Sequence, residues 1–229
     1  MDWTSLIGRP RPAESDALRL LAVVHQLGES TDGGEWQLRG ERTLLELEHL
    51  VLQPRLLAHV LMHLFDLDPT WESRRATVSR RVRQLIELDE RRGVRVRRRG
   101  TLGASLDFPP TARWRRLDDA LAAASMRGLL RVDVQGQQGA GGGDVVYRLQ
   151  RGGARLLDDH FYTEGHAAAR QLEVSGVIRE FLPRWDGEWI AQQIDEARES
   201  VSAFRYAEQI PLERSILPEI FLVTFDERL

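Results

Sequence analysis

The sequence predicts an α+β fold that is predominantly helical. Leucine-rich segments with an apolar residue every three or four positions predict helices over most of the 229-residue chain. Two short segments, 94–99 and 131–136, begin with alternating apolar and polar residues, which predicts strands instead. Each of these segments follows an arginine-bearing helix and a glycine. We therefore expect helices joined to small antiparallel hairpins.

Three helices are expected in the N-terminal third. An extended leader precedes a helix over 15–27, which Gly28 can end. After a polar, glycine-containing loop, two leucine-rich helices follow over 41–53 and 54–67. Pro54 suits the first turn of the second helix, where its missing N–H costs little. These two helices look like the most buried part of the N-terminal half.

A helix with a basic hairpin is expected next. The helix over 71–92 repeats its apolar residues on one face, and Gly93 can end it. The segments 94–99 and 104–108 then form the two strands of the hairpin. Arginine is abundant here, because nine of the twenty-two residues in 79–100 are arginines.

The same order of elements follows 35 residues later. A helix is expected over 111–130, ending near Gly128, and strands over 131–136 and 144–150 are joined by a glycine-rich tip. Another helix begins at about residue 151. The sequence thus predicts helix, glycine, strand, turn and strand twice.

The C-terminal part is helical and acidic. Helices are expected over 166–182 and 187–207, and the final segment EIFLVTFDERL is expected to be a strand or a docking tail. The second helix carries apolar residues at spacings of four and three, which form a short heptad-like seam and favour a homodimer through the C-terminal helices. The seam comprises Ile190, Ile194, Ala197, Val201 and Phe204.

The composition excludes several classes of chemistry. There is no cysteine, which excludes disulfides, thiol nucleophiles and cysteine-ligated zinc. All 32 basic residues are arginine, which a GC-rich genome explains without a functional reason. No apolar run is long enough to span a bilayer, and the N-terminus has no secretory signal pattern. We expect a cytoplasmic protein without membrane contact.

The charge is unevenly distributed. The segment 73–116 holds fourteen arginines and four acids, a net charge of +10, whereas the whole chain carries −3. A basic segment in an acidic protein suits an anion-binding surface. It suits a contact with the acidic remainder, within the chain or between subunits, equally well.

The second unit carries a resemblance to a known family. Its arginine-bearing helix leads to Gly128-Leu129-Leu130, a tip from Gly136 to Gly143, Tyr147-Arg148-Leu149 and a helix with Gly153. This order resembles the recognition helix and wing of winged helix-turn-helix regulators of the PadR and MarR kind. Residues 77–97 are similar to the same helix and strand. The resemblance covers less than half of the chain and identifies no specific family.

One spacing departs from that family. Only two residues separate the first hairpin from the second arginine helix, whereas a complete second winged helix needs two more helices there. Either the two halves share helices, or one unit is not a winged helix. Tandem winged-helix subunits that bind kleisins in condensin-like complexes are similar in size and acidity, and they act mainly by binding protein.

These observations predict the domains and the function. We expect a leader and helix over 1–40, a winged-helix core, tandem or degenerate, over 41–162, and a dimerisation or docking segment over 163–229. The expected function is double-stranded DNA binding by a bacterial-type dimeric transcriptional regulator or DNA-organising factor. The alternative is an adaptor subunit whose winged helices bind another protein.

The expected DNA contacts are polar side chains of the two units, which would bind phosphates and read part of the base sequence. Alternatively, the helical arginines form ion pairs on a solvated face. The first set is Arg80, Arg83, Gln84, Arg91, Arg95, Arg97, Arg98 and Arg99, and the second set is Arg113, Arg115 and Arg116.

Other candidate sites are interpreted as structural. The segment QGQQGAGGGDV lacks the end of a phosphate-binding P-loop and suits a flexible tip. His59 and His63 are four residues apart, a spacing that metal sites use, but their helix is apolar and favours structural histidines. No nucleophile elbow or acid–base pair is recognisable. We expect no catalysis, no cofactor and no metal.

Overall fold

The leucine pattern of the N-terminal third forms three helices. The computed structural model describes residues 12–31, 35–97, 110–135, 144–162, 166–182, 186–209 and 216–229. Helix α1 (Pro12–Leu27) is followed by α2 (Glu41–Leu52) and α3 (Pro54–Leu67), and Pro54 begins α3 as expected. All three helices supply fully buried leucines to one hydrophobic core.

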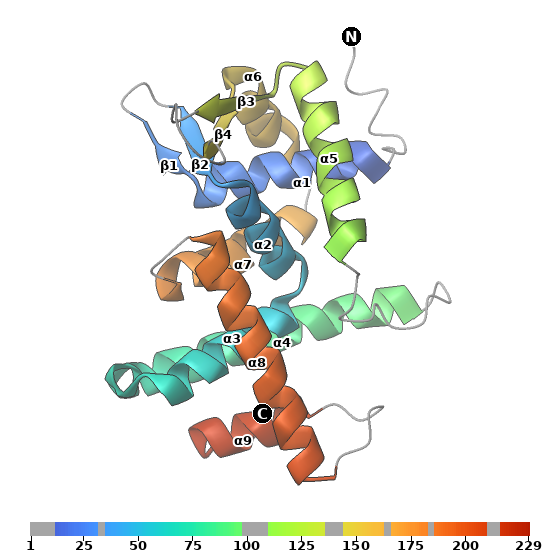
Figure 1. The fold of residues 1–229 in the computed structure, drawn as a ribbon. Helices are drawn as coiled ribbons and strands as arrows, with labels where there is room; N and C mark the ends of the chain where they lie inside the picture. The colour runs from blue at the N-terminus through green and yellow to red at the C-terminus, as the bar shows by residue number, and fades with distance from the viewer. Residues whose placement is uncertain are drawn as a thin grey trace.

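A four-stranded antiparallel sheet accompanies the helices. Its strands are β1 (Glu29–Ser30), β2 (Trp36–Arg39), β3 (Leu130–Gln135) and β4 (Asp144–Leu149), in the order β1-β2-β4-β3. Leu38 on β2 and Val132 on β3 both lie opposite Tyr147, which is buried. The predominantly helical α+β class is confirmed (Figure 1).

The first basic unit differs from its prediction. A 3-10 turn (Pro69–Arg74) leads into one long helix, α4 (Arg75–Arg97), which continues through Gly93. The predicted strand is therefore wrong over 94–97, and the repeat of helix and hairpin is not reproduced there. Residues 98–109, including Arg98, Arg99 and the expected strand 104–108, lie outside the described residues.

The physical reason is that the segment GVRVR contains no signal that forbids a helix. Arginine is a good helix former, valine costs only a few tenths of a kcal/mol, and an internal glycine costs about 1 kcal/mol. A strand needs a neighbour for its backbone hydrogen bonds, and no strand of the described residues pairs with this segment.

The second unit is confirmed in its described residues. Helix α5 (Pro110–Met126) ends before Gly128, which has a φ of 65°. This left-handed conformation favours glycine and turns the chain into β3. Helix α6 (Arg151–Leu156) follows β4 and continues as a π-helical turn (Leu157–Phe161). The expected tip, 136–143, lies outside the described residues.

The C-terminal segment forms α7 (His166–Phe181), α8 (Gly187–Ala207) and α9 (Leu217–Phe225). Two predictions are corrected here. The apolar end of the chain forms a helix, because Phe221 and Phe225 lie one turn apart and are both buried. In addition, α8 packs on α2 and α3, so that Ile190, Ile194 and Ala197 of the seam are buried within the same chain and not available to a partner.

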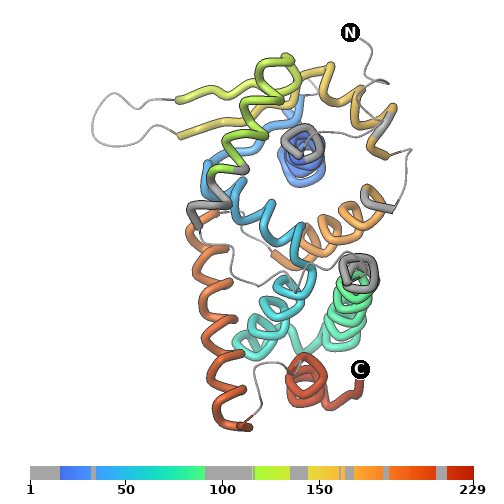
Figure 2. Tube along the Cα trace, turned by 90° about the vertical axis from the view of Figure 1, so that its right-hand side faces the viewer, coloured from blue at the N-terminus to red at the C-terminus, as the bar shows by residue number. Residues whose placement is uncertain are grey.

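The elements occupy two ends of the molecule (Figure 1). One end contains α1, α5, α6 and the sheet, and the other contains α3, α4, α9 and the end of α8, with α2 between them. Strands β3 and β4 project away from the helices (Figure 2). Helix α1 packs on α5, and β2 pairs with β4, so the N-terminal segment and residues 110–149 share one core.

Candidate functional site

Three polar residues of α4 contact carboxylates of the same chain. Arg81 Nη2 lies 2.9 Å from Glu180 Oε2 on α7, and Arg83 Nη2 lies 2.8 Å from Glu227 Oε2. Gln84 Nε2 donates to Glu173 Oε2 at 3.3 Å. Two members of the expected DNA-contact set, Arg83 and Gln84, therefore hold the C-terminal part of the chain against α4.

Glu227 is the centre of this contact. The Ser79 hydroxyl donates to it at 2.8 Å, and this hydrogen bond, followed by that of Arg83, lowers the pKa of the Glu227 carboxyl. The Arg83 guanidinium also lies 4.8 Å from the centre of the Phe221 ring, within the range of a cation–π contact. The α4 surface is thus matched to α9 and to the residues after it.

A shallow cleft of about 410 Å³ runs along this face of α4. Within it, Arg80 is exposed and forms no ion pair with any described residue. Two arginines and two glutamates line the cleft, so its formal charge is balanced. Its lining residues are Ala76, Ser79, Arg80, Arg83, Gln84, Glu87 and Glu227. The backbone of Arg91, Arg95 and Arg97 lies in α4, and their side chains lie outside the described residues.

Helix α5 presents a mixed surface. Its buried residues, such as Leu117 and Ala124, lie on the side of the helix that packs on α1. Arg115 is exposed, but so are Asp118 and Asp119 on the following turn. The side chains of Arg113 and Arg116 lie outside the described residues. The described outer face of α5 is therefore not basic.

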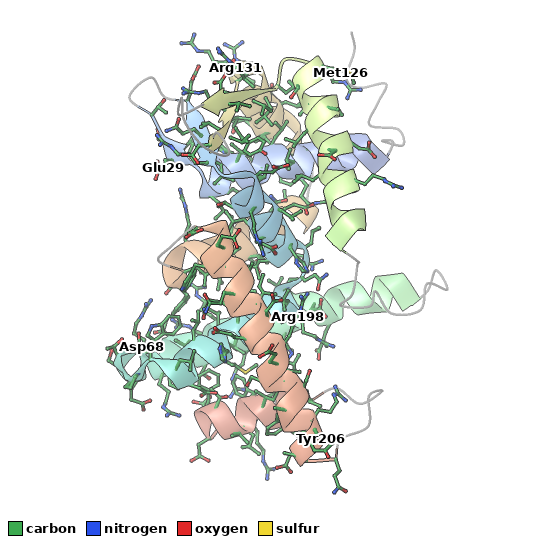
Figure 3. The ribbon with its side chains drawn as sticks, viewed as in Figure 1. Glu29, Asp68, Met126, Arg131, Arg198 and Tyr206 are labelled. Atoms are coloured by element: carbon green, nitrogen blue, oxygen red, sulfur yellow. The ribbon has the colours of Figure 1, made fainter. Side chains whose placement is uncertain are left out.

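A further group of arginines lies at the base of the β3–β4 hairpin. Arg131 on β3 and Arg148 on β4 are directly opposite each other, and Asp133 bridges them at 2.7 Å and 3.0 Å. The Arg131 side chain is 69% exposed, although its Nε donates to Asp133. Figure 3 shows Arg131 at the opposite end of the molecule from Tyr206.

Neighbouring elements add three more arginines to this group. Leu129 receives a hydrogen bond from the backbone of Gln150, and Gly153 of α6 packs on the Leu129 carbonyl, so the start of α6 lies against the start of β3. The added arginines are exposed and lie before β3 or on α6. We call the group the hairpin-base cluster; it consists of Arg127, Arg131, Arg148, Arg151 and Arg155.

The sequence interpretation missed this cluster, although a charge count contains the signal. Residues 127–135 and 144–156 hold five arginines and two aspartates, a net charge of +3 in an acidic chain. The five arginines are distributed over several elements. They come together only because β3 pairs with β4. Arginine is more frequent in 79–99, and the predicted DNA contacts were therefore placed mainly there.

The two candidate histidines of α3 have different surroundings. His59 is buried in α3, and burial lowers its pKa to about 4, with the Arg55 guanidinium acting in the same direction. His63 lies 3.4 Å from Glu196 on α8. Among the described residues, no group of three histidines or carboxylates could hold a metal ion.

Comparisons with known proteins give no relative. No family model, no curated protein and no solved structure matches this chain. Among the described residues, no single helix is long and apolar enough to cross a membrane. The pair α2 and α3 reaches that length and composition together, but it is bent by 106° and most of its side chains are buried in the core.

Proposed function

We propose that this chain binds double-stranded DNA through a winged-helix core, and that the hairpin-base cluster supplies the phosphate contacts. The observation that carries the proposal is the hairpin-base cluster, in which four exposed arginines and the half-buried Arg148 lie beside a projecting β-hairpin in a protein of net negative charge. Arginine binds phosphate oxygens with two parallel hydrogen bonds, and a localised basic surface attracts the DNA backbone.

The order of elements supports the winged-helix core. Helix α1, strand β2, helices α2 and α5, and strands β3 and β4 follow one another along the chain, and β4 pairs with both β2 and β3. Three helices followed by a wing hairpin have this order in winged helix-turn-helix proteins. In this interpretation α3 and α4 are an insertion between the second and third helices.

The charges of α5 modify the expected mode of binding. A recognition helix in the major groove approaches phosphates, which repel carboxylates. Because Asp118 and Asp119 are exposed on α5, we assign the main contacts to the hairpin and α6 and expect little reading of base sequence. Backbone-directed binding of this kind suits a DNA-organising factor better than a sequence-specific regulator.

The test is binding of the purified chain to a random-sequence duplex, measured by fluorescence anisotropy at low salt. Replacing Arg131, Arg151 and Arg155 with alanine removes three of the exposed cations and is expected to weaken binding at least tenfold. The matched control is Arg80→Ala, since Arg80 is exposed, has no ion-pair partner among the described residues and lies on α4 at the other end of the molecule. Equal weakening by both variants would contradict the assignment.

An adaptor that binds another protein is the second candidate. It is favoured by the exposed acidic turn of α5 and by Met126, whose side chain is 83% exposed at the end of the same helix. Methionine is enriched at protein interfaces, and carboxylates disfavour a DNA backbone. If the wild-type chain fails to bind duplex DNA even at low salt, this candidate takes precedence.

A further inference from the structure

Among the described residues, strand β3 is an edge of the sheet with one unpaired side. The order β1-β2-β4-β3 leaves it bonded to β4 alone among the described residues. Edge strands present a row of free N–H and C=O groups, which is a template for another strand. The opposite edge, β1, has only two residues and offers a much shorter template.

The hydrogen-bond pattern identifies which residues face the open side. Gln150 N donates to Leu129 O, and Leu129 and Gln150 continue the β3–β4 register. Because bonded and non-bonded pairs alternate in antiparallel sheets, Arg131 and Asp133 direct their backbone groups at β4. Leu130, Val132 and Val134 direct theirs at the open side.

The same strand exposes apolar side chains. Val132 is 40% exposed and Val134 is 70% exposed, although both lie on the sheet face that carries the buried Tyr147. β3 has no proline, so each of its outward backbone N–H groups can donate to a second strand. This edge therefore has the properties of an interface.

We propose that two copies of this chain dimerise by antiparallel pairing of their β3 strands, centred on Val132. In this register Val132 lies opposite Val132 of the partner subunit, and their outward backbone groups form a hydrogen-bonded pair. The Leu130 backbone is bonded in the same way to Val134 of the partner subunit. The two sheets then form one continuous sheet of eight strands, twice the four of one chain.

The charges of β3 complement themselves in this register. Arg131 lies opposite the partner's Asp133, and Asp133 lies opposite the partner's Arg131. These are non-hydrogen-bonded pairs, in which facing side chains approach most closely. Opposite charges that face each other across two strands stabilise the pairing, whereas like charges destabilise it. The strand sequence LRVDV is thus self-complementary about its central valine.

The geometry also brings the two hairpin-base clusters together. The two-fold axis passes through the sheet, so each face of one sheet continues into the same face of the other. Arg131 then lies close to Arg131 of the partner subunit, and Arg148 lies one strand further from the axis on the same face. The backbone pairing of the two β3 edges needs no DNA, although Arg131 belongs both to the hairpin-base cluster and to the dimer contact.

The first experiment is the mass of the full chain in solution, measured by light scattering during gel filtration at tens of micromolar. We expect twice the mass of one chain. Val132→Pro is expected to give a monomer, because proline removes the central outward N–H but no hydrogen bond to β4. Far-ultraviolet circular dichroism and the melting temperature show whether the variant remains folded.

Charge variants test the register separately. Asp133→Arg places arginines opposite arginines and is expected to give a monomer, whereas R131D/D133R restores opposite charges and is expected to give a dimer again. A monomeric wild type, or a dimer that persists in folded Val132→Pro, would overturn the proposal. A folded R131D/D133R variant that stays monomeric would overturn the register. If Val132→Pro does not fold, the masses of the two charge variants in solution test the dimer instead.

Discussion

His59 shows how a single buried residue makes the stability depend on pH. Its pKa is about 4 in the folded chain and 6.5 when exposed, so the unfolded state binds the proton more readily. His59 therefore does not lower the free energy of unfolding above pH 6.5. Below that pH the free energy of unfolding falls, until the pH reaches about 4. The Nδ1 atom has no hydrogen-bond partner among the described residues, so a neutral apolar side chain can replace the ring.

We predict that His59→Leu flattens this dependence. Between pH 7 and pH 5 the wild type is expected to lose about 2 kcal/mol of unfolding free energy through this histidine, from the linkage of proton binding to folding. Urea unfolding at the two pH values measures the difference. The loss attributable to His59 should disappear in the variant, and an identical pH dependence in both proteins would contradict the assignment.

At the same scale, the ion pairs of α4 explain why the expected DNA contacts could not be identified from the sequence. Arg83 and Glu227 are 144 residues apart, and Gln84 and Glu173 are 89 apart. No local pattern predicts which acid an arginine meets across such separations. The sequence does show an excess of arginine, but only the packing of α7, α9 and the C-terminal residues decides which of them remain exposed.

At the scale of elements, the start of α8 depends on one close approach. The Gly187 N–H donates to the Thr43 hydroxyl of α2 at 3.0 Å. A Cβ atom on Gly187 would lie 2.4 Å from the Thr43 backbone nitrogen, which cannot move without shifting α2. The contact joins two helices that are far apart in the chain.

We predict opposite effects of alanine at two glycines. Gly187→Ala is expected to destabilise the chain by about 3 kcal/mol, as overpacking of a buried site does. Gly176→Ala on an exposed position of α7, where nothing lies within 4 Å of the added atom, is expected to stabilise it by roughly 0.5 to 1 kcal/mol through helix propensity. Urea unfolding measures the change in the free energy of unfolding for each variant. Destabilisation of similar size in both variants would contradict a special role for the close approach at Gly187.

Helices were predicted correctly from the sequence where the apolar repeat extends over several turns. Helices α2, α3, α7 and α8 begin and end within two residues of the predicted bounds, because each repeats its apolar positions over several turns. Strands β1 and β2 together have six residues, too few for alternation to be recognised. The α4 error arose because alternating valine and arginine suit both a strand and a helix.

At the scale of the whole molecule, the sheet connects the proposed function with the proposed dimer. β4 joins the N-terminal β2 to the projecting β3, Arg131 and Arg148 lie on one face of the hairpin, and no strand of the described residues pairs with the free edge of β3. The predicted α8 seam could not be assigned from sequence alone, because a heptad spacing does not distinguish a partner subunit from α2 and α3 of the same chain.

The central claim is that the hairpin-base cluster contacts DNA phosphates, and the salt dependence of binding tests it most directly. The logarithm of the binding constant falls linearly with the logarithm of salt concentration, with a slope of roughly 0.9 per phosphate contact. We predict that replacing Arg131, Arg151 and Arg155 with alanine makes this slope shallower by about 2 to 3, whereas Arg80→Ala leaves it unchanged. A slope that is the same in the wild type and the triple variant would contradict the claim.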